Sequence, residues 1–385
     1  MRYISLGTID RNSIPIFIGC IFSFLSRLLY NYDGIILFKH SIISNIVSAF
    51  SRVIMLIPLI ILKIRTKKIN IDENDNKDRK NSKKGKLLYT NSKKIIIRGK
   101  YWYINLSSVI FFIQGIMLLY TIEIKTNFWI SEILITCIFY YLIFKIKLHK
   151  HHYSTIILII LTGIILDLVF ENLQNDLSNR ILLFFIRFTR EILYSLHDVV
   201  NKYLMEKKFC SPYEICFYNG LIGLILLTLF SILNYYYFDM DNFEEYLDKF
   251  NTIELLAAIG YLITQLGLYL FSLITNKKNT PCHIFIIYVF GQLAYYMDFS
   301  ANSIILIFCL IFILFLSLIF NEIIEINIWG LSDDTKRRIR LRAEEENTDI
   351  EKDKEIDEND DIVLKEENND NDLLIELVER KEDKE

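Results

Sequence analysis

The stretch SIILIFCLIFILFLSLIF, Ser303–Phe320, runs for 18 residues without a charged residue, a proline or a glycine. A helix needs about 20 predominantly apolar residues to cross the hydrocarbon core of a bilayer. This stretch therefore predicts a transmembrane helix that ends near residue 324. It is the clearest of several such segments in the chain.

Nine further segments are similar in length and apolar content, although the first contains Arg27 and Asp33 and the sixth carries several charges. The ten predicted spans are residues 14–36, 41–63, 101–122, 127–146, 153–170, 181–205, 212–237, 251–275, 282–298 and 302–324. Backbone polar groups inside a bilayer must be satisfied within the protein, which helices achieve on their own. The sequence therefore predicts an all-α membrane protein with ten transmembrane helices.

Basic residues are concentrated in every second connection between the predicted spans. Counting from a cytoplasmic N-terminus, the second, fourth, sixth and eighth connections are basic, and KRRIRLR, 336–342, follows the last span. The other connections contain few basic residues, as in YYYFDMDNFEEYLDKF, 235–250. Because cytoplasmic loops carry an excess of Lys and Arg, this alternation supports ten spans and two cytosolic termini. We expect an integral protein of an endomembrane (Golgi, ER or vacuole) or of the plasma membrane.

The chain also contains polar segments of strongly biased composition. Residues 333–385 include 22 Asp and Glu against 11 Lys and Arg, and the loop 64–100 is rich in Asn and Lys. Such segments bury too little apolar surface to fold, so we expect both to be largely disordered. The predicted parts are a cytosolic N-terminus, a first five-helix repeat with the basic loop 64–100, a second five-helix repeat and an acidic tail; they cover residues 1–13, 14–170, 171–324 and 325–385.

The sixth predicted span contains RFTREILYSLHDVVNK, 187–202, in which the polar residues share one helical face. They are Arg187, Arg190, Glu191, Tyr194, Ser195, His197, Asp198, Asn201 and Lys202. A central charge costs about 2.5–3.5 kcal/mol on insertion, whereas each large aliphatic residue returns only about 0.3–0.6. We therefore expect this face to line an internal cavity, with pairs Arg187–Glu191 and Asp198–Lys202 at i,i+4 spacing. A helix lying on the membrane surface is the alternative.

The two halves of the chain show a weak internal repeat. SRLLYNYDGIILFK, 26–39, can be aligned with REILYSLHDVVNKY, 190–203, and the following segment aligns Phe50-Ser51-Arg52 with Phe217-Tyr218-Asn219. Because five is odd, a second copy of five spans would enter the membrane in the opposite sense. Inverted repeats of this kind form a binding site near the midplane that opens alternately to each side.

Ten short spans, cytosolic termini and a five-plus-five plan resemble the drug/metabolite transporter superfamily. The segment Val199–Phe230 is similar to the sixth and seventh helices of its nucleotide-sugar-transporter-like branch. Phe217-Tyr218-Asn219-Gly220 resembles the Phe-Tyr-Asn-Asn motif with which fungal GDP-mannose transporters contact substrate, with Gly220 in place of the second Asn. The Gly-Ala-Leu-Asn-Lys motif of that subfamily is absent. The resemblance implies a ten-helix carrier that needs neither a cofactor nor ATP.

Candidate substrate-binding residues come from the polar face, from the motif and from isolated polar positions within spans. They are Arg187, Arg190, Glu191, Tyr194, Asp198, Asn201, Lys202, Tyr218, Asn219, Gln265 and Gln292. Arg190 or Lys202 could bind an anionic nucleotide, and Glu191 or Asp198 could carry a proton in exchange. Each isolated polar residue could equally form a hydrogen bond between helices.

Several other activities find no support in the sequence. The six cysteines are scattered, and no P-loop, GxSxG or HExxH motif is present, so we expect no enzyme. LHKHHY, 148–153, lies at a basic membrane edge, and no metal site is expected there. The expected partners are the lipid bilayer and a small molecule, without nucleic acid. A homodimer and a cytosolic partner for the acidic tail are left open.

We therefore predict a secondary transporter of a small polar or anionic metabolite, with a nucleotide sugar as one candidate. The alternative is a non-transporting membrane scaffold or receptor-like protein, whose polar helix face only binds neighbouring helices. Dry packing around Asn201 and Asn219 would favour the scaffold, and an open polar cavity there would favour the carrier.

Overall fold

A computed structural model of the chain describes residues 4–6, 12–30, 41–62, 64, 100–121, 128–146, 148–171, 177–237, 251–296, 301–326, 335 and 341–342. The chain divides into two units, Ile9–Ile324 and a smaller one made of Met1–Thr8 and Glu325–Glu385. The predictions for the loop 64–100 and the acidic tail fall almost entirely outside the described residues, and that for the N-terminus falls partly outside them. Two short strands, β1 (Ile4–Leu6) and β2 (Ile324–Ile326), form a two-stranded sheet.

Helices dominate the described part of the larger unit. The α-helices are α1 (Ile14–Tyr30), α2 (Ser41–Val53), α5 (Lys100–Thr121), α6 (Glu132–Phe144), α7 (Lys150–Glu171), α8 (Leu177–Lys207), α9 (Pro212–Tyr237), α11 (Thr252–Lys278), α12 (Ile284–Gln292) and α13 (Ala301–Phe320). Short 3₁₀ turns, η2 (Phe128–Ser131), η3 (Pro281–His283) and η4 (Leu293–Tyr296), adjoin α6 and α12.

Each of the ten predicted apolar segments overlaps one of these helices over much of its length, which confirms their helical character. Among the described residues, three helices are long and apolar enough to cross a membrane, namely Ile43–Leu62, Pro212–Leu233 and Thr252–Lys278. Five shorter helices are also apolar: Ile14–Tyr30, Glu132–Phe144, Lys150–Leu166, Pro281–Gln292 and Ile304–Phe320. The first range, Ile43–Leu62, joins α2 to the helical residues that follow it.

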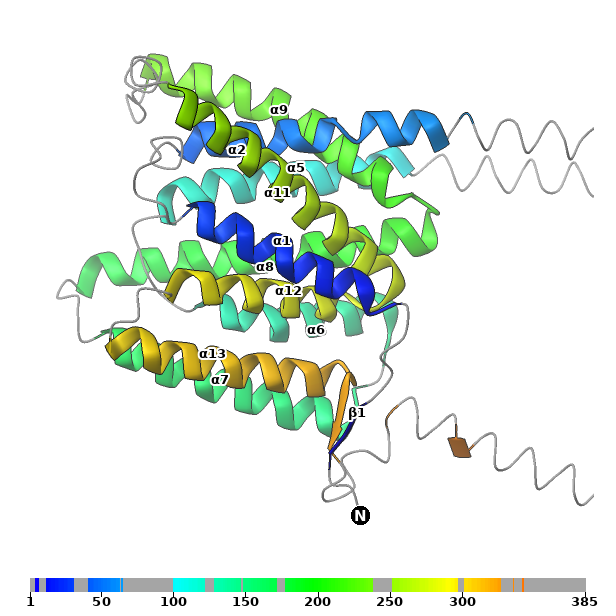
Figure 1. Ribbon diagram of the computed structural model, residues 1–385, viewed down its shortest axis with the longest axis vertical. Helices are drawn as coiled ribbons and strands as arrows, with labels where there is room; N and C mark the ends of the chain where they lie inside the picture. Colours follow the sequence, from blue (N-terminus) through cyan, green and yellow to red (C-terminus); the bar gives the residue numbers. More distant parts are fainter. Residues whose placement is uncertain are drawn as a thin grey trace, which may run out of the picture. The chain divides into compact units, whose positions relative to one another are not determined.

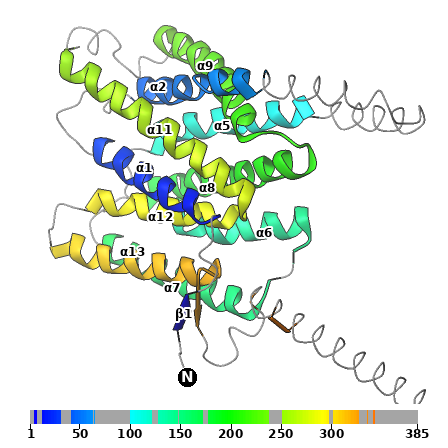
Figure 2. The ribbon, with the colours of Figure 1, turned by 45° about the vertical axis from the view of Figure 1, so that its right-hand side comes forward.

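The helices of the larger unit lie roughly alongside one another (Figures 1 and 2). Helix α1 packs against α11 and α12, and α8 packs against α5 and α6. Helix α2 packs against α9 and α11, and α9 also contacts α5. Helices α7 and α13 form a further pair, which α12 joins through α13. Every helix thus has at least one partner from the other half of the chain.

A break follows α2 directly. Pro58 has no backbone N–H, and its ring would clash with the carbonyl of residue 54, so a straight helix cannot pass through this point. The chain forms a turn at Ile54–Met55 instead, where the Met55 N–H donates to the Arg52 carbonyl at 3.1 Å, before helical structure resumes. Arg52 therefore occupies the last turn of α2, immediately before the break.

Apolar side chains cover much of the outer surface of this unit, while many polar side chains are inside. Trp102, Phe308 and Leu256 are 71%, 69% and 64% exposed, and exposed Ile and Leu residues recur along most helices. Conversely, Ser51, Ser107 and other hydroxyl-bearing residues are fully buried. In water-soluble proteins, polar and charged residues are mostly exposed, so the number of buried polar side chains here is unusual.

Candidate functional site

The polar face of α8 is turned toward the protein interior. Seven of its residues are exposed by 6% or less: Arg187, Glu191, Ser195, His197, Asp198, Asn201 and Lys202. Helices α5, α6 and α11 pack against α8. A helix resting on a membrane surface would leave its polar face in water, so this arrangement agrees with a helix inside the bundle.

The ion pairs along α8 differ from the two expected from i,i+4 spacing. Glu191 accepts from its neighbour Arg190, with Nη2 to Oε1 at 2.8 Å, instead of pairing with Arg187. Lys202 pairs with Glu206 at 2.8 Å, one turn further along, instead of with Asp198. Asp198 lies beside His197, with 3.7 Å between Oδ1 and Nδ1. Neither expected pair is formed, although Lys202–Glu206 is itself an i,i+4 pair. Spacing on one helix offers several partners, and the surroundings of each side chain decide among them.

Lys202 also caps the C-terminus of α11. Its ammonium group donates to the carbonyls of Asn276 at 2.8 Å and Lys277 at 3.3 Å, and to that of Asn279. The Asn276 side chain in turn donates to the Asp198 carbonyl at 2.7 Å. Terminal carbonyls of a helix lack intrahelical partners and carry partial negative charge, so a buried cation is stabilising there. Lys202, a candidate substrate-binding residue from the sequence, therefore contacts the end of α11 in this structure.

A network of hydrogen-bonding side chains connects α8 to α5, α9 and α11. Its members come from four helices and are Ser107, Ser108, His197, Asn201, Asn219 and Tyr269. Ser107 donates to Asn201 and Ser108 to Asn219, both at 2.7 Å. The Asn219 amide group donates to Tyr269 at 2.6 Å and lies 3.3 Å from the His197 ring nitrogen Nε2. The two asparagines predicted from sequence are therefore brought together at one place.

Arg52 of α2 lies against this network. Its guanidinium carbon is 3.6 Å from the ring centroid of Phe111 and 3.8 Å from that of Tyr269. The side chain is only 6% exposed, and its Nε and Nη1 atoms make no hydrogen bond. In the described part of the chain, no carboxylate lies within ion-pair distance of it. Aromatic faces attract a cation, but they do not replace the hydrogen bonds that a guanidinium group loses on leaving water.

Gly220 allows the close approach of α2 and α9 at this point. A Cβ atom at position 220 would lie 2.6 Å from the Arg52 Cβ and 2.8 Å from both the Ala49 carbonyl oxygen and the Val53 nitrogen. Two of these atoms belong to the backbone of α2, which cannot yield by a side-chain rotation. Any larger side chain at position 220 would therefore force α2 and α9 apart.

The remaining predicted residues are dispersed. Tyr218 is half-buried and meets the ring of Tyr101 edge-on, with centroids 6.1 Å apart. Gln265 donates to Ser26 at 2.6 Å, as expected for a hydrogen bond between helices. Tyr194 lies 5.9 Å from the Arg190 guanidinium, and the half-buried Gln292 ends α12.

The surroundings of Asn201 and Asn219 are closed in this structure. The two side chains are 1% and 0% exposed, and their polar atoms are engaged by other side chains. A separate pocket of about 310 Å³ lies between α2, α9 and α11, and its lining, which includes Phe50 and Leu224, is apolar. We expected dry packing around these two asparagines for a scaffold and an open polar cavity for a carrier, so the closed packing favours the scaffold alternative.

Several residues of the site were missed from the sequence. Arg52 stands in the middle of the predicted span 41–63, where its insertion cost alone was a sufficient signal. Ser107, Ser108 and Tyr269 gave no such signal, because hydroxyl groups are common in membrane helices. No protein-family model matches the chain, and no curated protein is detectably similar to it in sequence.

Proposed function

We propose that this chain is an integral membrane carrier that moves a small anionic metabolite by alternating access. The observation that carries the proposal is the buried Arg52 guanidinium, which has no carboxylate partner among the described residues and no hydrogen bond to them at Nε and Nη1. Burying a charge without a partner costs on the order of several kcal/mol. A buried arginine that makes no ion pair with the described residues is therefore more easily explained if it binds a negatively charged ligand. A nucleotide sugar is one candidate substrate, in line with the resemblance to the drug/metabolite transporter superfamily.

The distribution of apolar side chains supports insertion into a membrane. Exposed apolar patches on soluble monomers rarely exceed a few hundred Å². Here large apolar residues are exposed along most helices, including Phe17, Leu142 and Leu161 at 55%, 62% and 52%. Ten transmembrane spans, cytosolic termini and residence in an endomembrane or the plasma membrane belong to this proposal.

The pattern of helix contacts supports a five-plus-five inverted repeat. If α1, α2, α5, α6 and α7 correspond to α8, α9, α11, α12 and α13, the contact α1–α11 corresponds to α8–α5, and α1–α12 corresponds to α8–α6. Likewise α2–α11 corresponds to α9–α5, whereas α2–α9 and α7–α13 correspond to themselves. Arg52 and Asn219, aligned in the proposed repeat, both contact Tyr269.

In this mechanism Arg52 binds the anionic group of the substrate through its unused N–H donors, because guanidinium groups match carboxylates and phosphates in geometry. Asn201, Asn219 and His197 then supply neutral hydrogen bonds to the rest of the ligand. The described conformation is closed, so entry requires the helices to separate. The break after α2 at Ile54–Met55 is a suitable hinge, since it already interrupts the helical hydrogen bonds.

A non-transporting scaffold is the second candidate, and the closed packing around Asn201 and Asn219 favours it. In that case the network only fixes how α5, α8, α9 and α11 pack together. The two candidates differ in one measurable property: a scaffold binds no small anion at Arg52.

Uptake into proteoliposomes distinguishes them. The purified protein would be tested with labelled nucleotide sugars, nucleotides and organic anions, and with neutral sugars as the uncharged comparison. Arg52→Gln should abolish uptake of the anion that the wild type transports. Lys207→Gln, which removes an exposed charge at the end of α8, is the matched control and should leave uptake unchanged. Uptake that survives Arg52→Gln would exclude this site, and no uptake of any compound would favour the scaffold.

A further inference from the structure

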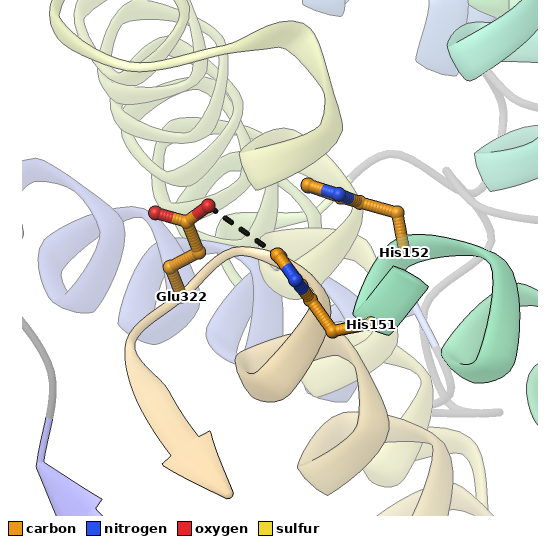
Figure 3. Close-up of side chains that lie close together, drawn as sticks. All are labelled: His151, His152 and Glu322. Carbon is orange, nitrogen blue, oxygen red and sulfur yellow. Dashed lines mark ion pairs between the residues drawn. The ribbon is translucent and has the colours of Figure 1, made fainter. Parts of the chain in front are cut away.

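A second cluster of chemically reactive side chains lies away from Arg52, where α7 begins and α13 ends. His151 and His152 occupy the first turn of α7, and Glu322 follows the last turn of α13. Figure 3 shows the side chains of His151 and Glu322 pointing toward each other, with His152 beside them. One ligand atom from each of the three residues lies within 4.8 Å of the others.

Of the three residues in this cluster, His151 provides the strongest evidence for a ligand. The residue is 3% exposed, and neither ring nitrogen makes a hydrogen bond to any part of the chain that the structure describes. Nε2 lies 3.4 Å from the Glu322 carboxylate oxygen Oε1, which is close enough for attraction but does not form a hydrogen bond of good geometry. Buried polar groups are nearly always satisfied, so a buried imidazole with two unused nitrogens indicates a missing ligand.

Glu322 is held in place by the way α13 ends. The Ile323 N–H donates to the Leu318 carbonyl at 2.9 Å, and the Glu322 N–H donates to the Ile319 carbonyl at 3.0 Å. This pair of bonds forms a Schellman motif, which places Glu322 in the left-handed region with φ of 58°. Glycine is usual at this position because other residues are strained there. A glutamate here points its carboxylate toward His151 at the expense of some local strain.

We propose that His151, His152 and Glu322 bind one Zn²⁺ ion, which clamps α7 to α13. Two imidazoles and one carboxylate are a usual zinc-binding set, and three protein ligands leave the fourth position for water. A tetrahedral ion with ligands at about 2.0–2.2 Å separates its donor atoms by about 3.4 Å. His151 Nε2 and Glu322 Oε1 are already at that separation, and the remaining donor can approach by side-chain rotation.

His152 must adjust when the ion binds. Its Nδ1 accepts the backbone N–H of His149 at 3.0 Å, so the proton of the neutral ring resides on Nε2 in this structure. Binding through Nε2 moves that proton to Nδ1 and breaks this bond, whereas binding through Nδ1 replaces it. The neighbouring positive charge of Lys150 is exposed and therefore screened by solvent, while Glu322 neutralises one charge of the ion directly.

The proposal revises the expectation that LHKHHY, 148–153, binds no metal. That expectation considered only the histidines of this segment as ligands. Glu322, the third ligand, lies far from them in the sequence. Helix packing between α7 and α13 brings the third ligand into place. The inference does not depend on transport, since it concerns metal binding by the folded chain.

Metal binding to the full-length, untagged protein tests the proposal. After removal of metal with a chelator, Zn²⁺ would be titrated in competition with a chromophoric chelator, and Co²⁺ would report tetrahedral coordination through its visible absorption. We expect one ion per chain. His151→Gln and Glu322→Gln should each weaken binding by more than about 100-fold, because even changes outside the ligand set cost 10–100-fold.

Glu322→Gly separates binding from folding. Glycine is favoured at this left-handed position, so the variant should fold at least as well as the wild type while losing the ligand. Zn²⁺ should raise the melting temperature of the wild type and leave that of Glu322→Gly unchanged. His149→Gln, in the same histidine-rich segment but outside the triad, is the matched control and should retain binding.

Two results would overturn the proposal. One is the absence of stoichiometric binding in the wild type. The other is binding that persists in both Glu322 variants but disappears in His149→Gln, which would assign the ion to a surface histidine tract.

Discussion

Replacement of Gly220 by alanine should destabilise the contact between α2 and α9. The added methyl group would lie 2.6 Å from the Arg52 Cβ and 2.8 Å from two backbone atoms of α2. Ordinary van der Waals contact requires about 3.5–4.0 Å, so α2 has to move by several tenths of an ångström or more. Overpacking of this kind costs about 1–3 kcal/mol, whereas alanine in a helix interior gains about 1 kcal/mol over glycine. The net change in the free energy of unfolding is therefore a loss of about 0–2 kcal/mol.

Gly260→Ala in α11 is the matched control. The nearest heavy atom to a Cβ at position 260 is the Leu29 Cδ1, at 3.6 Å, which is ordinary contact. This variant should gain stability by up to about 1 kcal/mol from helix propensity alone. Thermal unfolding of the two variants in the same detergent provides the assay, and Gly220→Ala should melt below Gly260→Ala. An equal or higher melting temperature for Gly220→Ala would refute the close approach of the two helices.

Three further predictions concern Arg52, Lys202 and Trp102. Arg52→Met should change the melting temperature little. The variant loses two cation–π contacts of up to about 2 kcal/mol each, but it no longer buries a charge, which removes a desolvation cost of similar size. If the chain is the proposed carrier, the same variant should bind the transported anion about 10- to 150-fold more weakly in a ligand titration. This factor corresponds to the loss of one charge-assisted hydrogen bond of about 1.5–3 kcal/mol. Lys202→Gln should accelerate hydrogen exchange in the last turn of α11, measured by mass spectrometry, and unchanged exchange would argue against the cap. Trp102 is 71% exposed, so brominated lipid should quench its fluorescence in a variant that lacks the other two tryptophans. Quenching of this fluorescence by aqueous iodide alone would contradict contact with the membrane.

The charged residues of α8 and Arg52 of α2 differ in the groups that surround them. Arg190 is paired with Glu191, and Lys202 is engaged by Glu206 and the end of α11. These groups stabilise the fold through bonds within the protein. Arg52 contacts two aromatic rings instead, and so retains donors for a ligand. In the proposed carrier, the anion-binding group therefore lies on α2 and not on α8, the helix that carries the most charged residues.

The sequence by itself determined where helices form and which of them carries polar residues inward. Apolar runs such as Ser303–Phe320 specify helices locally, since their composition and length leave few other ways to satisfy the backbone. The polar face of α8 was equally readable, because the period of a helix fixes which residues share a face.

Only the tertiary structure decided which side chains meet. Ser107, Asn219 and Tyr269 belong to three helices, and their hydrogen bonds depend on how those helices pack. The same holds for Glu322 and His151, and for the use of Lys202 as a cap on α11. Periodicity specifies the direction of a residue on its own helix but carries no information about the partner helix. Close contacts such as that at Gly220 determine that partner.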